Sequence, residues 1–175
     1  MKKLAFSMII LLCACALADN LQTVEVKQKS SSAEDEAAKV EKQKEDKDNT
    51  FKWYDNLDEA MKESERLHRP IFALFTGSDW CPWCIKLERE ILSKPEFQKY
   101  AARHFIMFKV DELRKTRMPQ AVALKNREYL NKYGVRGFPT VLLLDKKGRL
   151  LTQTGYRAGG PENYIEHLKY IQGKK

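Results

Sequence analysis

The sequence predicts an α/β fold in which helices flank a central mixed β-sheet. Short continuous apolar runs at 71–76 and 140–144 are typical of buried strands. Segments with helical periodicity alternate with these runs, which favours layers of helices over a sheet. A turn at 145–148 and a returning strand follow the second run, so part of the sheet is an antiparallel hairpin.

Each expected element has a local signal at its ends. Asn56 and Glu59 form a capping box that starts the first helix, and Pro95 lies in the first turn of another helical stretch. Pro119 opens the helix that Gly134 ends, because glycine readily adopts the left-handed conformation after a helix. In chain order, we expect a helix at 56–68, a strand at 71–76, helices at 85–92 and 96–103, a strand at 104–111, a helix at 119–133, strands at 140–144 and 149–154, and a last helix from 161.

The N-terminus has the pattern of a secretory signal peptide, which we assign to residues 1–18. Two lysines precede an almost wholly apolar run, and Ala16 and Ala18 have the spacing of a cleavage site before Asp19. The apolar run is shorter than the roughly 20 residues that a membrane-spanning helix needs. A lipoprotein anchored at Cys15 is the alternative, and in both cases the protein is exported to a compartment that permits disulfides.

Residues 19–50 differ in composition from the rest of the chain. They contain no aromatic residue and many charged ones, so they cannot bury enough apolar surface to offset their ordering entropy. We expect a flexible, charged linker there, followed by one folded domain at 51–175. The formal charge of +8 is spread along the chain and mixed with acidic residues, so we expect no nucleic acid as a partner.

The stretch 80–84, Trp-Cys-Pro-Trp-Cys, carries the candidate chemistry. It lies between the strand at 71–76 and a helix, so Cys81 and Cys84 occupy a helix N-terminus. Unpaired N–H groups and the helix dipole favour a thiolate there, which makes Cys81 an exposed nucleophile with a lowered pKa. Cys84 lies one helical turn away, shielded, and can attack the mixed disulfide that forms.

A structural disulfide and half of a zinc site are the alternatives to this redox-active centre. Cys13 and Cys15 lie in the predicted signal peptide, so Cys81 and Cys84 would be the only cysteines of the mature chain. Zinc would need further ligands at metal-binding spacing, which the histidines lack. They are His68, His104 and His167. Covalent haem attachment would need a histidine after Cys84, where Ile85 stands, so we expect neither a metal nor another cofactor.

A second motif, at 133–140, has the sequence Tyr-Gly-Val-Arg-Gly-Phe-Pro-Thr. Together with the Trp-Cys-x-x-Cys stretch it resembles the thioredoxin fold family, and the resemblance covers residues 51–173. The chain is most similar to exported bacterial members, which act as thiol–disulfide oxidoreductases in the periplasm. The resemblance implies that Pro139 is cis, faces the cysteines and offers backbone to an extended substrate segment.

Four residues beside the cysteines are expected to bind substrate. Trp80 would shield one flank of the sulfur, and Phe138 would line the same groove as Pro139. Trp83, between the cysteines, would help substrates dock through an exposed ring, or would simply pack against the fold. Pro82, also between the cysteines, is assigned a supporting role.

One position departs from thioredoxins, which carry a buried aspartate in the strand before the active site. Phe75 stands at that position, so the usual proton acceptor is missing. Glu88 lies one helical turn beyond Cys84 and would take its proton, unless it is a solvated surface charge. One exported family member, the C-terminal domain of a transmembrane reductant conductor, similarly carries a glutamate there. Lys109 matches a lysine that thioredoxins place near the aspartate, and it would pair with Glu88 or extend to the surface.

The expected function is that of an exported protein-disulfide oxidoreductase, and more specifically of a reductase. Its expected partners are disulfide-containing exported proteins and a membrane or periplasmic thiol–disulfide partner that recycles it. A disulfide-forming oxidase or an isomerase is the alternative, although an isomerase usually has a dimerisation domain and we expect a monomer. Outside the enzymes, the alternative is a chaperone-like protein-binding module with an incidental disulfide.

Overall fold

The computed structural model describes residues 39, 40, 42 and 47–173. The chain divides into two units, residues 1–40 and 41–175, and the fold below is that of the second unit. The predicted signal peptide at 1–18 and most of the predicted linker lie outside the described residues. Within the described part of the chain, no helix combines the length and the apolar character needed to cross a membrane.

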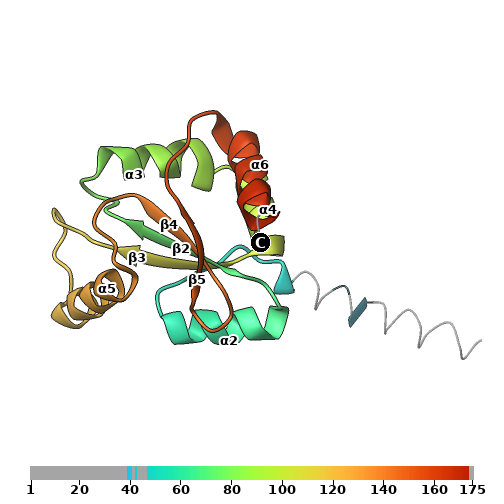
Figure 1. Ribbon diagram of the computed structural model, residues 1–175, viewed down its shortest axis with the longest axis horizontal. Helices are drawn as coiled ribbons and strands as arrows, with labels where there is room; N and C mark the ends of the chain where they lie inside the picture. Colours follow the sequence, from blue (N-terminus) through green and yellow to red (C-terminus); the bar gives the residue numbers. More distant parts are fainter. Residues whose placement is uncertain (1–38, 41, 43–46, 174–175) are drawn as a thin grey trace, which may run out of the picture. The chain divides into compact units, whose positions relative to one another are not determined.

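Five strands form one mixed sheet in the order β1-β3-β2-β4-β5 (Figure 1). β3 runs parallel to β1 and β2, whereas β4 is antiparallel to both β2 and β5. The strands are β1 (Trp53–Tyr54), β2 (Ile71–Thr76), β3 (Ile106–Asp111), β4 (Thr140–Leu144) and β5 (Leu150–Thr154). The helices are α2 (Leu57–Leu67), α3 (Pro82–Leu87), η1 (Glu88–Leu92), α4 (Pro95–His104), α5 (Gln120–Tyr133) and α6 (Gly160–Gly173). The predicted fold class, a mixed sheet flanked by helices, is confirmed.

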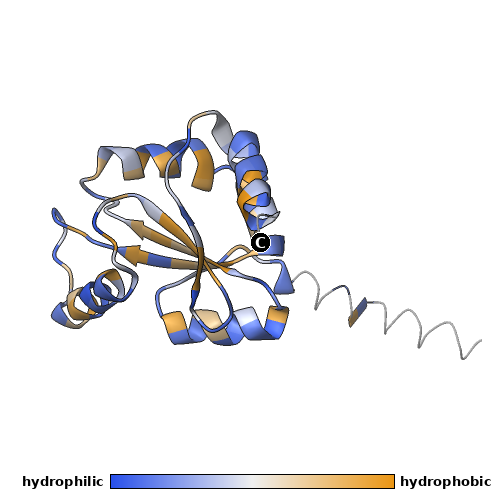
Figure 2. Cartoon of the chain, viewed as in Figure 1, coloured by the Kyte–Doolittle hydropathy of each residue, from blue (hydrophilic) through white to orange (hydrophobic). Residues whose placement is uncertain are grey.

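Helices cover both faces of the sheet and enclose two apolar clusters. α3, η1, α4 and α6 lie over one face, and α2 and α5 lie over the other (Figure 1). The side chains of β2 alternate between the clusters, with Phe72 and Leu74 on the first face and Ile71 and Phe75 on the second. All of β2 is buried, and Figure 2 shows the central strands as largely hydrophobic. Burial on both faces explains why β2 is a continuous apolar run rather than an alternating one.

Asn56 and Gly134 mark helix ends as predicted, although the hydrogen bonds found among the described residues do not include the Glu59 half of the predicted capping box. The Asn56 side chain accepts the backbone N–H of Asp58 at 2.9 Å and so starts α2. Gly134 ends α5 in the left-handed conformation, with a φ of 63°. The short strand β1 has no counterpart among the predicted elements, because two residues are too few for a periodic pattern.

The predicted helix at 85–92 is α-helical only as far as Leu87, and its last turn is a π-helix. The Ser93 N–H donates to the Glu88 carbonyl, five residues back, at 3.0 Å. This longer bond replaces the usual four-residue spacing. Apolar spacing does not distinguish the two helix types over one turn, so the sequence carries no signal for η1.

The folded unit makes contacts with residues before the predicted domain boundary at 51. Arg66, in the last turn of α2, pairs with Asp48. Arg69 donates to the Asp48 carbonyl at 2.8 Å and to the Asn49 side chain at 2.9 Å. These bonds hold the segment before β1 against the end of α2.

Phe75 lies fully buried in the cluster covered by α2 and α5. Its ring meets Tyr133 edge-to-face, with the ring centroids 6.0 Å apart. The Tyr133 hydroxyl donates to the Gly148 carbonyl at 3.0 Å, and burial raises the pKa of Tyr133 to about 12. The position at which thioredoxins carry an aspartate is apolar here, and a carboxylate in this cluster would be desolvated at large cost.

Replacing Phe75 by alanine should lower the free energy of unfolding by about 3–5 kcal/mol, because it removes a buried ring and leaves a cavity. Urea denaturation followed by circular dichroism measures the change. Val122→Ala, at an exposed position of α5, is the control and should change this free energy by less than about 0.5 kcal/mol. A loss below about 1 kcal/mol in Phe75→Ala would contradict the role given to this ring.

Candidate active site

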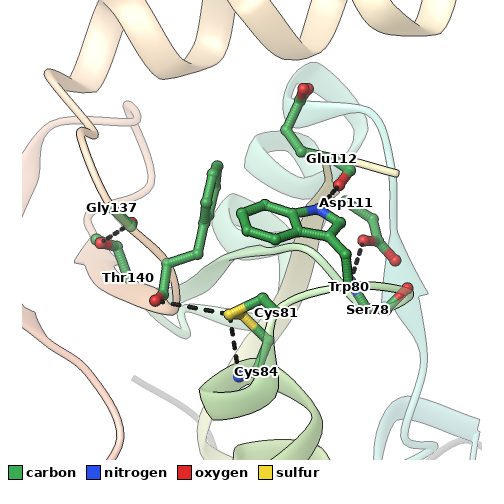
Figure 3. Close-up of a disulfide and its surroundings, with 9 residues drawn as sticks. Ser78, Trp80, Cys81, Cys84, Asp111, Glu112, Gly137 and Thr140 are labelled. Carbon is green, nitrogen blue, oxygen red and sulfur yellow. Dashed lines mark hydrogen bonds between the residues drawn. A yellow bond between two sulfur atoms is a disulfide. The ribbon is translucent and has the colours of Figure 1, made fainter. Parts of the chain in front are cut away.

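Cys81 and Cys84 lie at the junction between β2 and α3 and form a disulfide (Figure 3). Cys81 is the N-cap residue of α3, and Pro82 takes the first helical position, where a backbone N–H is not needed. The Cys84 N–H faces Cys81 Sγ at 3.3 Å, and the Cys81 N–H donates to the Gly77 carbonyl at 2.9 Å. The backbone thus aims the N-terminus of α3 at the sulfur of Cys81.

Both sulfurs are buried in this oxidised state. The exposed fraction of the residue is 4% for Cys81 and 3% for Cys84, so Cys81 is covered in the disulfide form, whereas the predicted exposure of Cys81 concerns the reduced thiol. The Phe138 carbonyl oxygen lies 3.7 Å from Cys81 Sγ, and the Trp80 and Phe138 rings meet edge-to-face at 5.9 Å. These two residues come from distant segments and close over the sulfur, which accounts for its burial.

The bond between Phe138 and Pro139 is cis, as the family resemblance implies. The turn before it is tied by the Thr140 hydroxyl, which donates to the Gly137 carbonyl at 2.8 Å (Figure 3). β4 runs antiparallel to β2, and its first residue, Thr140, pairs with Phe75 near the end of β2. This pairing places the Phe138–Pro139 segment beside the disulfide, at the end of β2.

Trp80 is held on the flank of Cys81 by several contacts. Its Nε1 donates to the Glu112 carbonyl at 2.6 Å (Figure 3), and the Arg114 guanidinium lies 3.5 Å from the ring centroid. A Cβ atom at Gly77 would overlap the indole, so glycine there leaves room for the ring. An indole fixed in this way suits the predicted shielding role.

Asp79 joins the loop before the cysteines to the loop after β3. Its carboxylate accepts the backbone N–H groups of Arg114 at 3.0 Å, Lys115 at 2.8 Å and Thr116 at 2.8 Å. Desolvation opposes ionisation, but these hydrogen bonds lower the pKa of Asp79 below its usual value. No role was predicted for Asp79, because its partners lie 35 to 37 residues later and leave no local signal.

Trp83 is an exposed aromatic residue on the other flank of the site. Its exposed fraction is 56%, and its ring meets that of Tyr156 at a centroid distance of 5.6 Å. The Lys86 ammonium lies 5.3 Å from the Trp83 ring centroid and 5.2 Å from the Tyr156 ring centroid. The ring of Trp83 is thus partly packed against Tyr156 and Lys86 and partly open to solvent.

Glu88 follows α3 directly, and its N–H donates to the Cys84 carbonyl. Burial raises the pKa of its carboxyl group, the positive charge of Lys109 lowers it, and Asp111 raises it again. The net shift is upward, as predicted. The residue as a whole is exposed, so protein atoms packed around the carboxyl group desolvate it only in part.

Lys109 lies on the face of the sheet that α3 and η1 cover. It pairs with Leu74 of β2 in the parallel register, whereas Phe75 points to the opposite face. The predicted match to a lysine near the thioredoxin aspartate is therefore wrong, because Lys109 does not face the position of Phe75. Its ammonium lies 5.4 Å from the Trp53 ring centroid and acts on Glu88 through the electrostatic field. Among the described residues, the close ion pairs do not include one between Lys109 and Glu88.

The arrangement can carry out thiol–disulfide exchange with its two sulfurs. Cys81 sits where helix N–H groups favour a thiolate, and Cys84 lies within disulfide reach, with the Cα atoms 5.2 Å apart. In the part of the chain that the structure describes, no group of three or more His, Cys, Asp or Glu residues could hold a metal ion.

Known proteins share this domain. The family of thioredoxin-like domains matches residues 57–172. The disulfide bond reductase DsbH of Chlamydia pneumoniae is 38% identical over 116 residues, which cover 66% of this chain and 70% of DsbH. A solved structure of a DsbH oxidoreductase superposes with a TM-score of 0.66 at 36% identity, covering 72% of this chain and 87% of that one. A thioredoxin from Thermus thermophilus shares the fold, with a TM-score of 0.52, 18% identity, and coverage of 70% and 88%.

The matched region contains every residue of the site described above, including the cysteine pair and the cis-proline, except Trp53 beside Lys109. It also spans all of the sheet except β1. The resemblance predicted from the two motifs is confirmed, and the chain belongs to the thioredoxin-like domain family as a thiol–disulfide oxidoreductase.

Proposed function

We propose that the protein is an exported reductase of protein disulfides. The observation that carries this proposal is the Cys81–Cys84 disulfide at the N-terminus of α3, beside the cis Phe138–Pro139 bond. In the reduced protein, the Cys81 thiolate attacks a substrate disulfide, forms a mixed disulfide and releases the other substrate sulfur, which takes up a proton. Cys84 then loses its proton and attacks Cys81 Sγ, which releases the reduced substrate and leaves the Cys81–Cys84 disulfide.

The surroundings of Cys81 favour the reductase direction. Its sulfur has the Cys84 N–H and the Phe138 carbonyl oxygen as polar neighbours. A carbonyl oxygen accepts a hydrogen bond from a thiol but repels a thiolate, so it limits stabilisation of the reduced, ionised state. Strongly oxidising members of this class depend on a stabilised reduced form. The 38% identity to a protein named disulfide bond reductase supports the same direction.

Substrates would bind along the segment of Phe138 and Pro139, where backbone groups can pair with an extended chain. Trp80 and Trp83 would flank the target disulfide, the first as a fixed wall and the second as a partly exposed one. Pro82 would support the site by starting α3 between the cysteines.

The proposed place of action is the periplasm, reached through the signal peptide at 1–18, with 19–50 as a flexible linker to the domain at 51–175. Exported proteins that contain disulfides are the proposed substrates. Each turnover leaves Cys81 and Cys84 oxidised, so a membrane or periplasmic thiol–disulfide partner must reduce them again.

The mature protein should reduce insulin disulfides with dithiothreitol as the electron source, and Cys81→Ser should abolish this activity because the attacking sulfur is lost. Equilibration with glutathione should give a potential closer to the about −270 mV of thioredoxin than to the about −120 mV of DsbA. A potential at the oxidising end would favour a disulfide-forming oxidase. Full activity of Cys81→Ser on insulin would indicate a binding module instead.

Glu88 is the proposed proton acceptor for Cys84 during resolution. A buried thiol is a poor nucleophile until it is deprotonated, and Cys84 is only 3% exposed. Glu88 has a carboxyl pKa raised by burial, which brings it nearer to the pKa of a thiol. Lys109, on the same face of the sheet, limits this rise.

Glu88→Gln should slow resolution of the mixed disulfide by about 10-fold or more, because it removes the base without changing the side-chain size. Stopped-flow turnover of a disulfide peptide should show the mixed disulfide accumulating, with the first attack by Cys81 much less affected. Unchanged resolution in this variant would leave water as the acceptor and reject the proposal.

Glu88→Gln should not lower the stability of the fold, so slower resolution would not reflect partial unfolding. The folded-state pKa of Glu88 is raised, so its ionised form destabilises the fold above that pKa, and an uncharged glutamine side chain avoids this cost at neutral pH. Glu96→Gln, at an exposed position in the first turn of α4, is the matched control and should leave both steps unchanged.

Intact-mass analysis of the protein from the cell envelope should give a chain that begins at Asp19, because signal peptidase would cleave after Ala18. Replacement of Ala18 by a bulky residue should block this cleavage. A mass that fits a lipid-modified Cys15 would contradict the prediction and make residues 19–50 a membrane tether.

A further inference from the structure

Four side chains beside the disulfide form a connected network that joins α3 and η1 to the loop after β5. Trp83, Lys86 and Glu90 follow one another at helical spacing along one stripe of the active-site helix. Tyr156, in the loop, contacts all three. Its ring meets the Trp83 ring at 5.6 Å, Lys86 lies 5.2 Å from its centroid, and its hydroxyl donates to Glu90 Oε2 at 2.6 Å.

The loop that carries Tyr156 lies against the substrate-binding segment. Thr154, the last residue of β5, is paired with Val141 of β4. Gly155 follows, and a Cβ atom on it would lie only 3.3 Å from the Pro139 carbonyl oxygen. Tyr156 is the next residue, so the loop runs past Pro139 and then reaches the helix that carries the cysteines.

The bond between Tyr156 and Glu90 is charge-assisted, which makes it the strongest contact of the network. Donation from Tyr156 lowers the pKa of Glu90, so the carboxylate stays ionised at neutral pH. Lys86 lies over both aromatic rings and adds a cation–π contact to each. Together these contacts restrict an indole that is 56% exposed and would otherwise sample several rotamers.

We propose that Glu90 and Tyr156 are positioning residues that hold the Trp83 ring beside the Cys81–Cys84 disulfide as a preformed wall for protein substrates. The inference rests on the proposed role of Trp83 in substrate binding. A preformed wall lowers the ordering cost when a protein segment docks on Pro139. Among the described residues, the polar neighbours of the Cys81 sulfur are the Phe138 carbonyl and the Cys84 N–H, and neither belongs to the network, so the network should act on binding and leave the exchange step itself unchanged.

Tyr156→Phe should raise the KM for insulin about 10-fold, the lower end of the effect of losing one hydrogen bond to a charged group, while kcat changes by less than about 2-fold. A small aliphatic disulfide, which has neither a protein segment to dock on Pro139 nor a ring to stack on Trp83, should react at the unchanged rate. Glu90→Ala should match Tyr156→Phe, and Glu90→Gln, which keeps an acceptor oxygen, should restore part of the loss. Tyr100→Phe, the same atomic change on α4, is the control and should alter neither parameter.

A double-mutant cycle with Trp83→Ala shows whether Tyr156 acts through the indole. The proposal requires that Trp83→Ala raises KM and that Tyr156→Phe adds nothing further in that background. An equal effect of Tyr156→Phe with and without Trp83 would overturn the proposal, as would no effect in the wild type. If Trp83→Ala itself leaves KM unchanged, the substrate-binding role of Trp83 fails first, and the positioning role fails with it.

Discussion

The antiparallel register between β2 and β4 is the constraint on which the site depends. Phe75 pairs with Thr140, so the residues that follow β2 and those that precede β4 emerge at the same end of the sheet. The cysteines come after β2, and Phe138 and Pro139 come before β4, which brings the Phe138 carbonyl to 3.7 Å from Cys81 Sγ. A shift of one residue would exchange the faces of β4 and move the cis-proline away from the sulfur. Close packing on both faces opposes such a shift, because it would exchange side chains of different size between the two apolar clusters.

The two faces of the sheet separate packing from the proposed proton transfer. Phe75 fills the face covered by α2 and α5 and leaves no place there for a carboxylate. Lys109 and Asp111 lie on the other face, where both influence the pKa of Glu88. β2 has Phe75 where thioredoxins have an aspartate, and the proposed proton acceptor, Glu88, lies instead on the active-site helix. There its pKa depends on burial, Lys109 and Asp111. Proton transfer to Cys84 would then occur from the helix side of the disulfide instead of through the sheet.

The features that could be predicted from sequence are those with short-range signals. Strands β2 to β5, the helix ends at Asn56 and Gly134 and the Cys81–Cys84 pair depend on neighbours a few residues away, and the structure contains them. The cis state of Pro139 came from the family resemblance, because local sequence does not determine it. The partners of Asp79 and the bond between Tyr156 and Glu90 join residues 35 to 66 positions apart, which only the assembled sheet brings together. The burial of the Cys81 sulfur has the same origin, since it depends on a carbonyl 57 residues away.

The anchoring of Trp80 indicates from which side a partner reaches the disulfide. The sulfurs are covered in the oxidised protein, so the partner that reduces them must displace part of their surroundings. Trp80 is bonded through Nε1 to Glu112 and covered by Arg114, in a loop that Asp79 also ties down. Moving it would break several contacts at once. Trp80 and Phe138 cover the Cys81 sulfur, and Trp80 is the one fixed by these contacts. Trp83 is held by side chains and already exposes more than half of its surface. We therefore expect access to open on the Phe138 side, with substrate and electron donor both meeting Trp83 as a wall that stays in place. The two must then use the site in turn, as an exchange cycle with a single reactive pair requires.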